Sequence, residues 1–277
     1  MVRVVTESTS DIPPDMADQL GITVVPSYVV FGSETYRDGV ELTKQEFYER
    51  LEATHEIPTT ATPPPSVYEE AYRQLARETD AIVSIHAAAR LSSLYDVASL
   101  AAQNISEARI TVIDSGQVSM GYGWMAVAAA EAAQQGKSLT QIVTLIESMK
   151  DRTHLFAVLD TLNFVYRGGR VGWVEALLGT LMRIKPIVDV WQGEVKLLER
   201  TRTWTRSLDR LIERVQALGP LERAMVLHAN APKEAEQLAD RLQSIAPNWR
   251  RLVGHAGVTI ASHTGPGAVG IACTAGH

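Results

Sequence analysis

Hydrophobic and polar positions in the first half of the chain follow two different periods. Short runs rich in β-branched residues predict strands, and longer stretches with apolar residues three or four positions apart predict helices. The predicted strands are Val2–Val5, Ile22–Phe31, Ala81–Ile85 and Ile110–Ile113. The predicted helices are Asp15–Leu20, Tyr68–Ala76, Leu91–Ala102, Gly121–Gln135 and Leu139–Met149. Strands that alternate with helices in this way predict a parallel, Rossmann-like sheet.

The pattern changes near residue 150, where the last of these helical stretches gives way to Lys150-Asp151-Arg152. The segment Ile187–Leu198 is divided by a Gln192-Gly193 turn and predicts a hairpin, which belongs in a mixed or antiparallel sheet. The other elements predicted there are a strand at Leu155–Leu159, a helix at Leu208–Leu218, a strand at Ala224–His228, a helix at Lys233–Ile245 and two strand-like runs near the end. We therefore predict an α/β protein with an N-terminal α/β domain, residues 1–150, and a C-terminal α/β domain with a mixed sheet, residues 151–277.

Composition narrows the class of protein. The 277 residues are 45% hydrophobic and 21% charged, which is typical of a globular chain and excludes disordered and collagen-like proteins. The formal net charge is −6 and basic residues are scattered, so we expect no nucleic acid partner. The one cysteine, Cys273, cannot form an internal disulfide, which favours a reducing compartment. The first apolar run is too short for a signal peptide, and no stretch approaches the roughly 20 apolar residues of a membrane span. We expect a cytoplasmic protein without an integral membrane segment.

Hydroxyl side chains gather in the loops that follow the predicted parallel strands. These loops meet at one edge of the sheet, where α/β proteins bind ligands. The side chains are Ser8, Thr9 and Ser10, then His86, Ser92 and Ser93, then Ser115 and Ser119. Hydroxyls and helix N-termini suit a carboxylate or a phosphate, so the loops predict a small anionic head group. The alternative is that each hydroxyl caps a helix, which is its commonest role.

Common catalytic and cofactor motifs are absent or lie in the wrong context. The segment Gly265–Gly270 fits a dinucleotide-binding pattern, but only the strand-like residues 271–277 follow it, whereas that pattern requires a helix and a later acidic residue. Its glycines instead predict a tight turn between two strands, with His263 at the end of the first as an anion donor or a structural histidine. The chain has no HExxH, phosphate-loop or GxSxG pattern, so we predict no metal and no cofactor.

Two groups of arginines are candidates for phosphate or partner contacts. Arg167 and Arg170 flank a glycine pair, and Arg202 lies with two more arginines around Trp204. The alternative is that Arg167 and Arg170 lie on a solvated turn and that Arg202 and its neighbours lie on a solvated strand face, and this explains both groups about as well as a binding role does.

Taken together, the motifs resemble one family over nearly the whole chain. They are TESTSD at the start, Pro26 with Phe31-Gly32 and Arg37-Asp38-Gly39, Thr60 before the proline run, Leu91-Ser92 with Tyr95, Asp114-Ser115, TLNFVYRGGRVG, IKPIVDV, Arg202-Thr203 and SHTGPGAVG. In this order and spacing the chain resembles the DegV family of bacterial fatty-acid-binding proteins, which includes the lipid-carrying subunit of fatty acid kinase.

The resemblance implies a site and a function. One long-chain fatty acid would lie between the two domains, with its carboxylate at Thr60, Ser92 and His263. The segments Val174–Met182 and Phe156–Leu159 could supply an apolar lining. A separate ATP-binding fatty acid kinase subunit would convert the bound acid to an acyl phosphate for phospholipid metabolism, so this chain would be a carrier and not an enzyme. Arg170 and Arg202 match arginines near the mouth, where they would contact the partner or the phosphate.

Three departures from the family pattern touch the head-group pocket. Glu7 replaces an aspartate, Ala61 replaces a hydroxyl residue, and Ser93-Leu94 replaces a Gly-Thr pair. Thr62 or Ser93 could supply the missing donors. Two other functions stay open: a small acyl or phosphoryl transferase or hydrolase with His263 as general base, and a binding module for another amphipathic acid.

Overall fold

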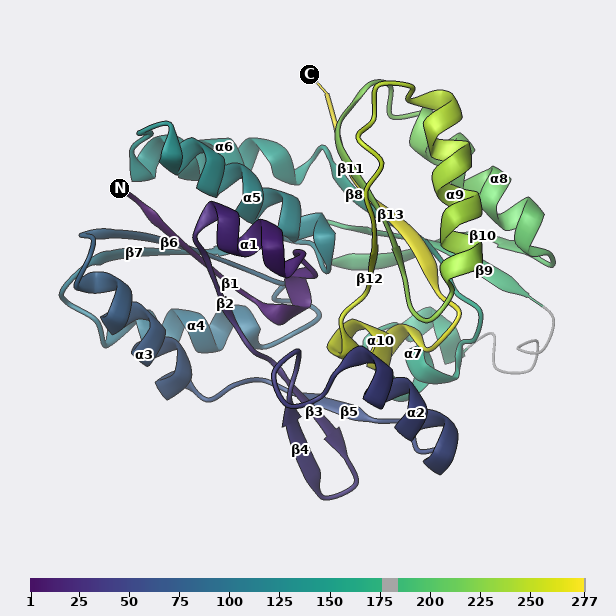
Figure 1. The fold of residues 1–277 in the computed structure, drawn as a ribbon, viewed down its shortest axis with the longest axis horizontal. Helices are drawn as coiled ribbons and strands as arrows, with labels where there is room; N and C mark the ends of the chain where they lie inside the picture. The colour runs from purple at the N-terminus through teal and green to yellow at the C-terminus, as the bar shows by residue number, and fades with distance from the viewer. Residues whose placement is uncertain (176–183, 277) are drawn as a thin grey trace.

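The computed structural model describes residues 1–175 and 184–276. Its first sheet is parallel, with the strand order β2-β1-β6-β7, as the alternation of strands and helices predicts. The strands are β1 (Arg3–Glu7), β2 (Ile22–Val25), β6 (Ala81–His86) and β7 (Arg109–Asp114). The helices of this part are η1 (Ser8–Ser10, a 3-10 turn), α1 (Pro14–Leu20), α3 (Pro65–Ala76), α4 (Leu94–Gln103), α5 (Met120–Gln134) and α6 (Leu139–Lys150). In Figure 1, α3 and α4 cover one face of the sheet, and α5 and α6 cover the other.

The second sheet is mixed and has the order β10-β9-β8-β13-β11-β12. Its strands are β8 (Thr153–Val158), β9 (Lys185–Trp191), β10 (Glu194–Thr201), β11 (Leu221–His228), β12 (Val253–His255) and β13 (Val269–Ala275). The predicted hairpin is confirmed as β9 and β10, which pair antiparallel around the turn at Gln192-Gly193. Helices α8 (Trp204–Gln216) and α9 (Pro232–Ile245) cover one face of this sheet (Figure 1).

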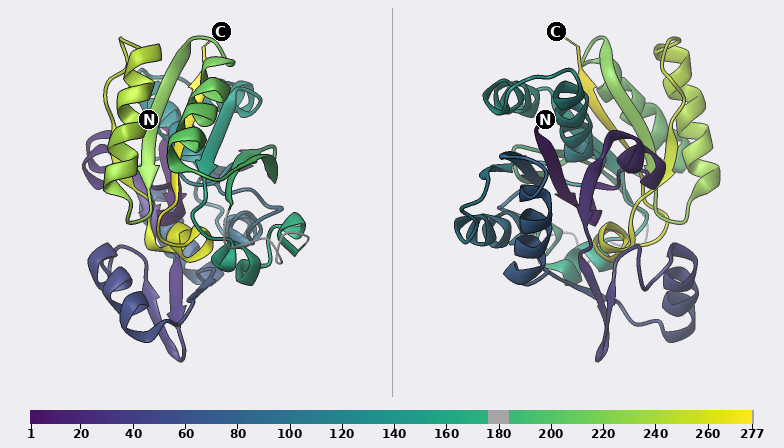
Figure 2. Two further views of the ribbon diagram at one scale, coloured as in Figure 1. Left: turned by 90° about the vertical axis from the view of Figure 1, so that its right-hand side faces the viewer. Right: turned by 60° about the vertical axis from the view of Figure 1, so that its left-hand side comes forward.

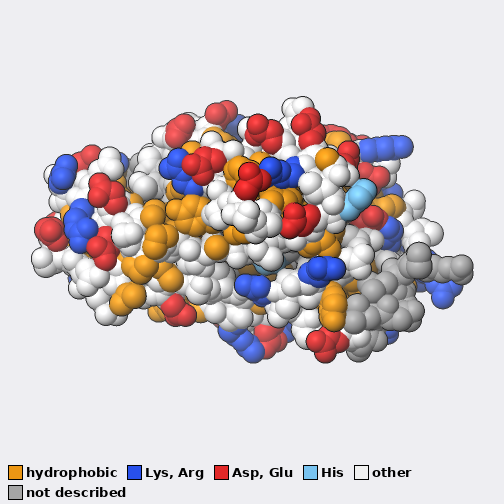
Figure 3. All heavy atoms as spheres, turned by 90° about the horizontal axis from the view of Figure 1, so that it is seen from below, with side chains coloured by type: hydrophobic (Ala, Val, Ile, Leu, Met, Phe, Trp, Pro, Cys, Tyr) orange, Lys and Arg blue, Asp and Glu red, His pale blue; other side chains and the backbone are white. Residues whose placement is uncertain are grey.

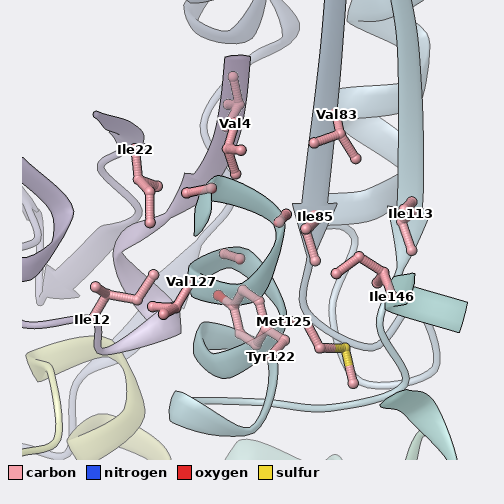
Figure 4. Close-up of a cluster of buried hydrophobic side chains, with 14 of the residues drawn as sticks. Val4, Ile12, Ile22, Val83, Ile85, Ile113, Tyr122, Met125, Val127 and Ile146 are labelled. Atoms are coloured by element: carbon pink, nitrogen blue, oxygen red, sulfur yellow. The ribbon is translucent and has the colours of Figure 1, made fainter. Parts of the chain in front are cut away.

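Helix α5 joins the two sheets. It contacts β1 and β6 of the parallel sheet and also β8 and β13 of the mixed sheet. Nearly all of its residues are buried, and six of them are alanines, so the helix is apolar on every side. Figure 4 shows Tyr122 and Met125 of α5 among Val4 and Ile85 of the parallel sheet and Ile146 of α6. The alanines explain how one helix can pack closely on two sheets at once.

A third sheet was not predicted. It has the order β4-β3-β5, with β3 (Tyr28–Phe31), β4 (Glu34–Arg37) and β5 (Thr59–Ala61), and helix α2 (Lys44–Thr54) packs beside it. Figures 1 and 2 place this sheet and α2 at the end of the molecule away from both termini. The prediction of one strand over Ile22–Phe31 is therefore wrong. Pro26 has no N–H for a sheet ladder, and the chain leaves the parallel sheet there.

A second prediction fails near the C-terminus. The residues before the glycine turn form a helix, α10 (Val258–Thr264), and not a strand, so His263 lies in the last turn of a helix. Buried helices and buried strands give similar short apolar runs, which is why the pattern misleads here. Gly265 and Gly267 have φ values of 74° and 88° and turn the chain from α10 into β13. Helix α7 (Asn163–Gly168) packs against α10.

The division at residue 150 stays a prediction, although α6 ends at Lys150 and the mixed sheet begins at Thr153. Within the described ranges, no helix combines the length and the apolar character that a membrane crossing requires. The predicted cytoplasmic location is a separate matter and also stays a prediction.

Candidate functional site

A cavity lies where the mixed sheet, the small third sheet and the loop between β6 and α4 meet. Its largest wall is apolar and comes from the mixed sheet. Leu155 and Ala157 on β8 lie opposite Val190 and Val188 on β9, and residues opposite one another share a face of the sheet. Leu159 directly after β8 extends this wall.

The predicted apolar lining is half right. In the segment Phe156–Leu159, Ala157 and Leu159 line the cavity, whereas Phe156 and Val158 lie on the other face in the core beneath α8. The alternation of side chains along a strand makes this division unavoidable. In the segment Val174–Met182, Val174 packs in the core around the third sheet, and residues 176–182 lie outside the described residues.

Polar side chains gather at one part of the cavity. The Thr60 hydroxyl and His263 Nε2 are 3.0 Å apart, and the hydroxyls of Thr62 and Ser93 are 2.7 Å apart. Ser92 belongs to the same lining, and its hydroxyl accepts the Leu94 N–H at 3.4 Å. The structure therefore brings all five predicted head-group residues to one cavity. Their contact with a ligand stays a prediction.

The two predicted arginines lie in different places. Arg170 lines the cavity, is exposed, and donates to the Gly168 carbonyl at 2.5 Å. Arg202 is also exposed, but it lies in the connection between β10 and α8 and is not among the described residues of the cavity wall. Figure 3 views the molecule from the side on which the third sheet lies and shows hydrophobic side chains across this face, with both basic and acidic side chains among them.

The environment of His263 keeps its imidazole neutral. Burial lowers the pKa of His263 to about 4, and the positive charge of Arg170 adds to the effect. A Cβ atom at Gly168 would lie 2.9 Å from His263 Nδ1, so the glycine allows α7 to approach the ring closely. At neutral pH the ring is an uncharged hydrogen-bonding group.

Strand alternation explains which hydroxyls on β5 share a face. Thr60 pairs with Val29 and Ala61 with Tyr28, so continuing the register sets Thr62 opposite Ser27. Side chains of Thr60, Thr62 and Ser27 therefore lie on one face, and Ala61 lies on the other. Ala61 nevertheless also lines the cavity, where it presents a methyl group in place of the hydroxyl of the family pattern.

Three hydroxyl residues of the cavity wall are not among those that the sequence predicts as ligand candidates, namely Ser27, Thr259 and Thr264. Thr9, one of the hydroxyls predicted after the first strand, also lines the cavity. The Ser27 hydroxyl is buried and has no hydrogen-bond partner among the described residues. Nothing in the local pattern of the sequence marks Ser27 or Thr259, because their places depend on the third sheet and on α10.

Glu7 has an interior role. Its carboxylate accepts hydrogen bonds from the Ala87 N–H and the Tyr122 hydroxyl, both at 2.9 Å, and lies 2.5 Å from His86 Nδ1. His86 Nε2 is in turn 2.7 Å from the Ser84 hydroxyl. This Ser–His–carboxylate order resembles a hydrolase triad, but Glu7, Ser84 and His86 are all fully buried. The network instead anchors Ala87, which begins the loop that carries Ser92.

His263 has no such triad. Its polar partner is a threonine hydroxyl, and no carboxylate of the described residues hydrogen-bonds to it. No cluster of three or more metal-binding side chains occurs within residues 1–175 and 184–276.

Comparison with known proteins agrees with the fold. The family model described as "Uncharacterised protein, DegV family" matches residues 1–275. Protein DegV of Bacillus subtilis is 32% identical over 274 residues, which cover 98% of each chain. A DegV domain-containing protein of Deinococcus radiodurans is 36% identical over 276 residues, which cover 98% of this chain and 97% of that one.

Solved structures give the same picture. A DegV family protein from Thermus thermophilus, described for its fatty acid binding, has a TM-score of 0.91 at 32% identity, with 99% of both chains covered. The crystal structure of DegV from Bacillus subtilis, described as a fatty acid binding protein, has a TM-score of 0.90 at 32% identity and the same coverage. By sequence and by fold, the chain belongs to the DegV family.

Proposed function

We propose that this chain binds one long-chain fatty acid, with the acyl tail against the mixed sheet and the carboxylate among Thr60, Ser92 and His263. The observation that carries the proposal is the division of one cavity into an apolar wall and a polar part. Thr62 and Ser93 would complete the donors around the carboxylate. Two structural relatives at 32% identity are described as fatty acid binding, which supports this assignment.

The two parts of the cavity would contribute differently to affinity. Each methylene buried against the β8 and β9 side chains contributes roughly 0.8 kcal/mol, so the tail would supply most of the binding free energy. The hydroxyls and the neutral imidazole of His263 would fix the orientation of the carboxylate. These groups hydrogen-bond to one another, and each hydroxyl can turn to donate to a carboxylate instead.

A carrier also needs a consumer of the fatty acid. We infer that a separate ATP-dependent fatty acid kinase subunit converts the bound acid to an acyl phosphate, as the resemblance to the lipid-carrying subunit of such a kinase implies. The sequence has no phosphate-loop pattern of its own, which agrees with ATP binding by the partner. Arg170, at the cavity, is suited to the charge of the developing phosphate, and Arg202, on the surface, is suited to contact with the partner. The chain would then act without a cofactor and in the cytoplasm.

The competing function is an acyl or phosphoryl transferase or hydrolase that uses His263 as general base. An imidazole with a pKa of about 4 is a weak proton acceptor at neutral pH, and a hydroxyl partner does not strengthen it. The geometry therefore favours binding. Turnover of a simple acyl ester by the purified protein, abolished in His263→Ala, would instead support the enzyme.

Mass spectrometry tests the proposal directly. The purified protein is measured under native conditions and again after organic extraction, and we expect one fatty acid per chain. A protein that is empty and that also fails to take up added palmitate would refute fatty-acid binding. The matched pair Ser92→Ala and Ser106→Ala separates the site from the surface, because Ser92 lines the cavity and Ser106 is exposed beyond α4.

A further inference from the structure

Two buried carboxylates meet at the N-terminal end of α10, beside Thr259, which also lines the cavity. Asp11 Oδ1 accepts the Gly257 N–H at 2.8 Å. Asp38 Oδ2 accepts the Thr259 hydroxyl at 2.7 Å and the Thr259 N–H at 3.4 Å, and also the Ser8 hydroxyl at 3.0 Å. Both aspartates are at most 9% exposed. Their contacts span more than two hundred residues of sequence and join the N-terminal part of the chain to α10.

These carboxylates replace a local helix cap. The first amides of a helix have no partner within the helix and need an acceptor. Gly257 is the N-cap residue of α10 and has no side chain to serve as one. Asp11 and Asp38 supply the acceptor oxygens from other parts of the chain.

The two ends of α10 are tied to the same small sheet. Asp38 follows β4, and its N–H donates to the carbonyl of Ser27, directly before β3, at 2.8 Å. At the other end of α10, His263 lies 3.0 Å from Thr60 on β5, which pairs with β3. Thr259, which Asp38 contacts, and His263 are four residues apart, so the two attachments lie only about 6 Å apart along the helix. A shift at the first attachment is therefore passed to the second.

We propose that Asp38 and Asp11 are positioning residues, which hold the N-terminal end of α10 so that His263 stays against Thr60 at the cavity. Asp38 makes the larger number of contacts to α10 and has the direct link to the third sheet. The expectation that loss of these carboxylates weakens fatty-acid binding rests on the proposed function. The expectation that it changes the position of His263 does not.

Gly257 offers a way to disturb this arrangement from the helix side. Its backbone is extended, with φ −64° and ψ 162°, so alanine can adopt it without strain. The added Cβ would lie 2.8 Å from Asp11 Oδ1 and 3.5 Å from Asp38 Oδ2, which forces a carboxylate or the helix to move. Gly172 is the matched control, because a Cβ there meets nothing within 4 Å. Asp189→Asn is the control for Asp38, since Asp189 is a buried carboxylate bound to His154 on the far face of the mixed sheet.

The test measures the ionisation of His263 in ligand-free protein by NMR of labelled histidine, with His263→Gln to assign the resonance. In the wild type we expect a His263 pKa of about 4. In Asp38→Ala and in Gly257→Ala we expect this pKa to rise toward the ordinary value near 6.5, because a displaced α10 exposes the ring to water. Asp189→Asn and Gly172→Ala should leave it unchanged.

Palmitate affinity, measured by displacement of a fluorescent fatty acid, gives the second readout. We expect Asp38→Ala and Gly257→Ala to bind palmitate about tenfold more weakly than the wild type, which corresponds to the loss of one hydrogen bond to the carboxylate. Asp189→Asn and Gly172→Ala should bind it as the wild type does. If the His263 pKa stays near 4 in Gly257→Ala, the positioning role is refuted, even where Asp38→Ala does not fold. If the wild type fails to bind palmitate while the pKa rises in the variants, the proposed function fails and the positioning role stands.

Discussion

Replacement of Ala157 by leucine tests whether the mixed sheet holds the acyl tail. Ala157 is a small side chain of the cavity wall, beside Leu155 and opposite Val188. Ala157→Leu adds three carbons on the cavity side of β8 and should displace about three methylenes of a long tail. At roughly 0.8 kcal/mol for each methylene, the loss is about 2.4 kcal/mol, or about 50-fold in the dissociation constant. An acid too short to reach this position should lose nothing.

The assay is a set of dissociation constants for saturated fatty acids of increasing length, measured for the wild type and for Ala157→Leu. Ala217→Leu is the control, since Ala217 is exposed after the end of α8 and lies outside the described wall of the cavity. We expect the two variants to differ only for long acids. Equal weakening of short and long acids, or no weakening at all, would refute the placement of the tail along β8 and β9.

Five further substitutions probe other parts of the molecule. Thr60→Ala and Ser92→Ala should each weaken binding of fatty acid by about 0.5–1.5 kcal/mol without unfolding the protein, and unchanged binding in both would refute the head-group site. Arg202→Ala should leave binding of fatty acid intact but slow acyl phosphate formation by the kinase subunit; loss of binding would instead move Arg202 into the pocket. Ser27→Ala should raise the melting temperature of the ligand-free protein, because it removes a buried hydroxyl without a partner, and a lower value would reveal a hidden partner. Burial and the nearby Asp38 raise the pKa of Asp11 to about 7, above its ordinary value of 3.8. Between about pH 4 and pH 7, the folded protein therefore keeps a proton on Asp11, whereas the unfolded chain has lost it. The contribution of Asp11 to stability therefore falls as the pH rises from about 4 to 7. Asp11→Asn should raise the melting temperature at pH 8, and the gain should shrink as the pH is lowered toward 4. A gain that does not depend on pH would contradict the assigned pKa.

The parts of the fold that the sequence predicts are those with long or repeated patterns. The alternation of strands and helices gives the parallel sheet, and a Gln-Gly turn gives the β9–β10 hairpin. The third sheet is missed because β2 and β3 form one apolar run, and Pro26 is the single local mark of the break between them. Helix α10 is missed because its seven residues are buried on most sides, and such a short apolar run has no clear period.

The residues of the candidate site also fall into those that the sequence predicts and those that it does not. Thr60, Ser92 and His263 could be named through motifs that match a family, and the fold then brings them to one cavity. Ser27 and Thr259 could not be predicted as site residues. The position of Ser27 depends on a strand pairing, and that of Thr259 depends on a helix that the sequence pattern does not reveal. Contacts between residues more than two hundred positions apart, such as Asp11 with Gly257, leave no periodic trace in a single sequence.

The arrangement of the cavity separates two kinds of recognition. The apolar wall belongs to β8 and β9, which are central or near-central strands of a six-stranded sheet backed by α8. The polar part belongs to shorter segments, namely the three-residue strand β5, the seven-residue α10 and the loop before α4. Short segments depend on distant contacts for their positions, as the carboxylates of Asp11 and Asp38 illustrate. A long strand is instead held in position by the backbone hydrogen bonds to its neighbouring strands. Tail length should therefore be set by single side chains of the wall, whereas the head-group geometry should respond to substitutions well outside the cavity.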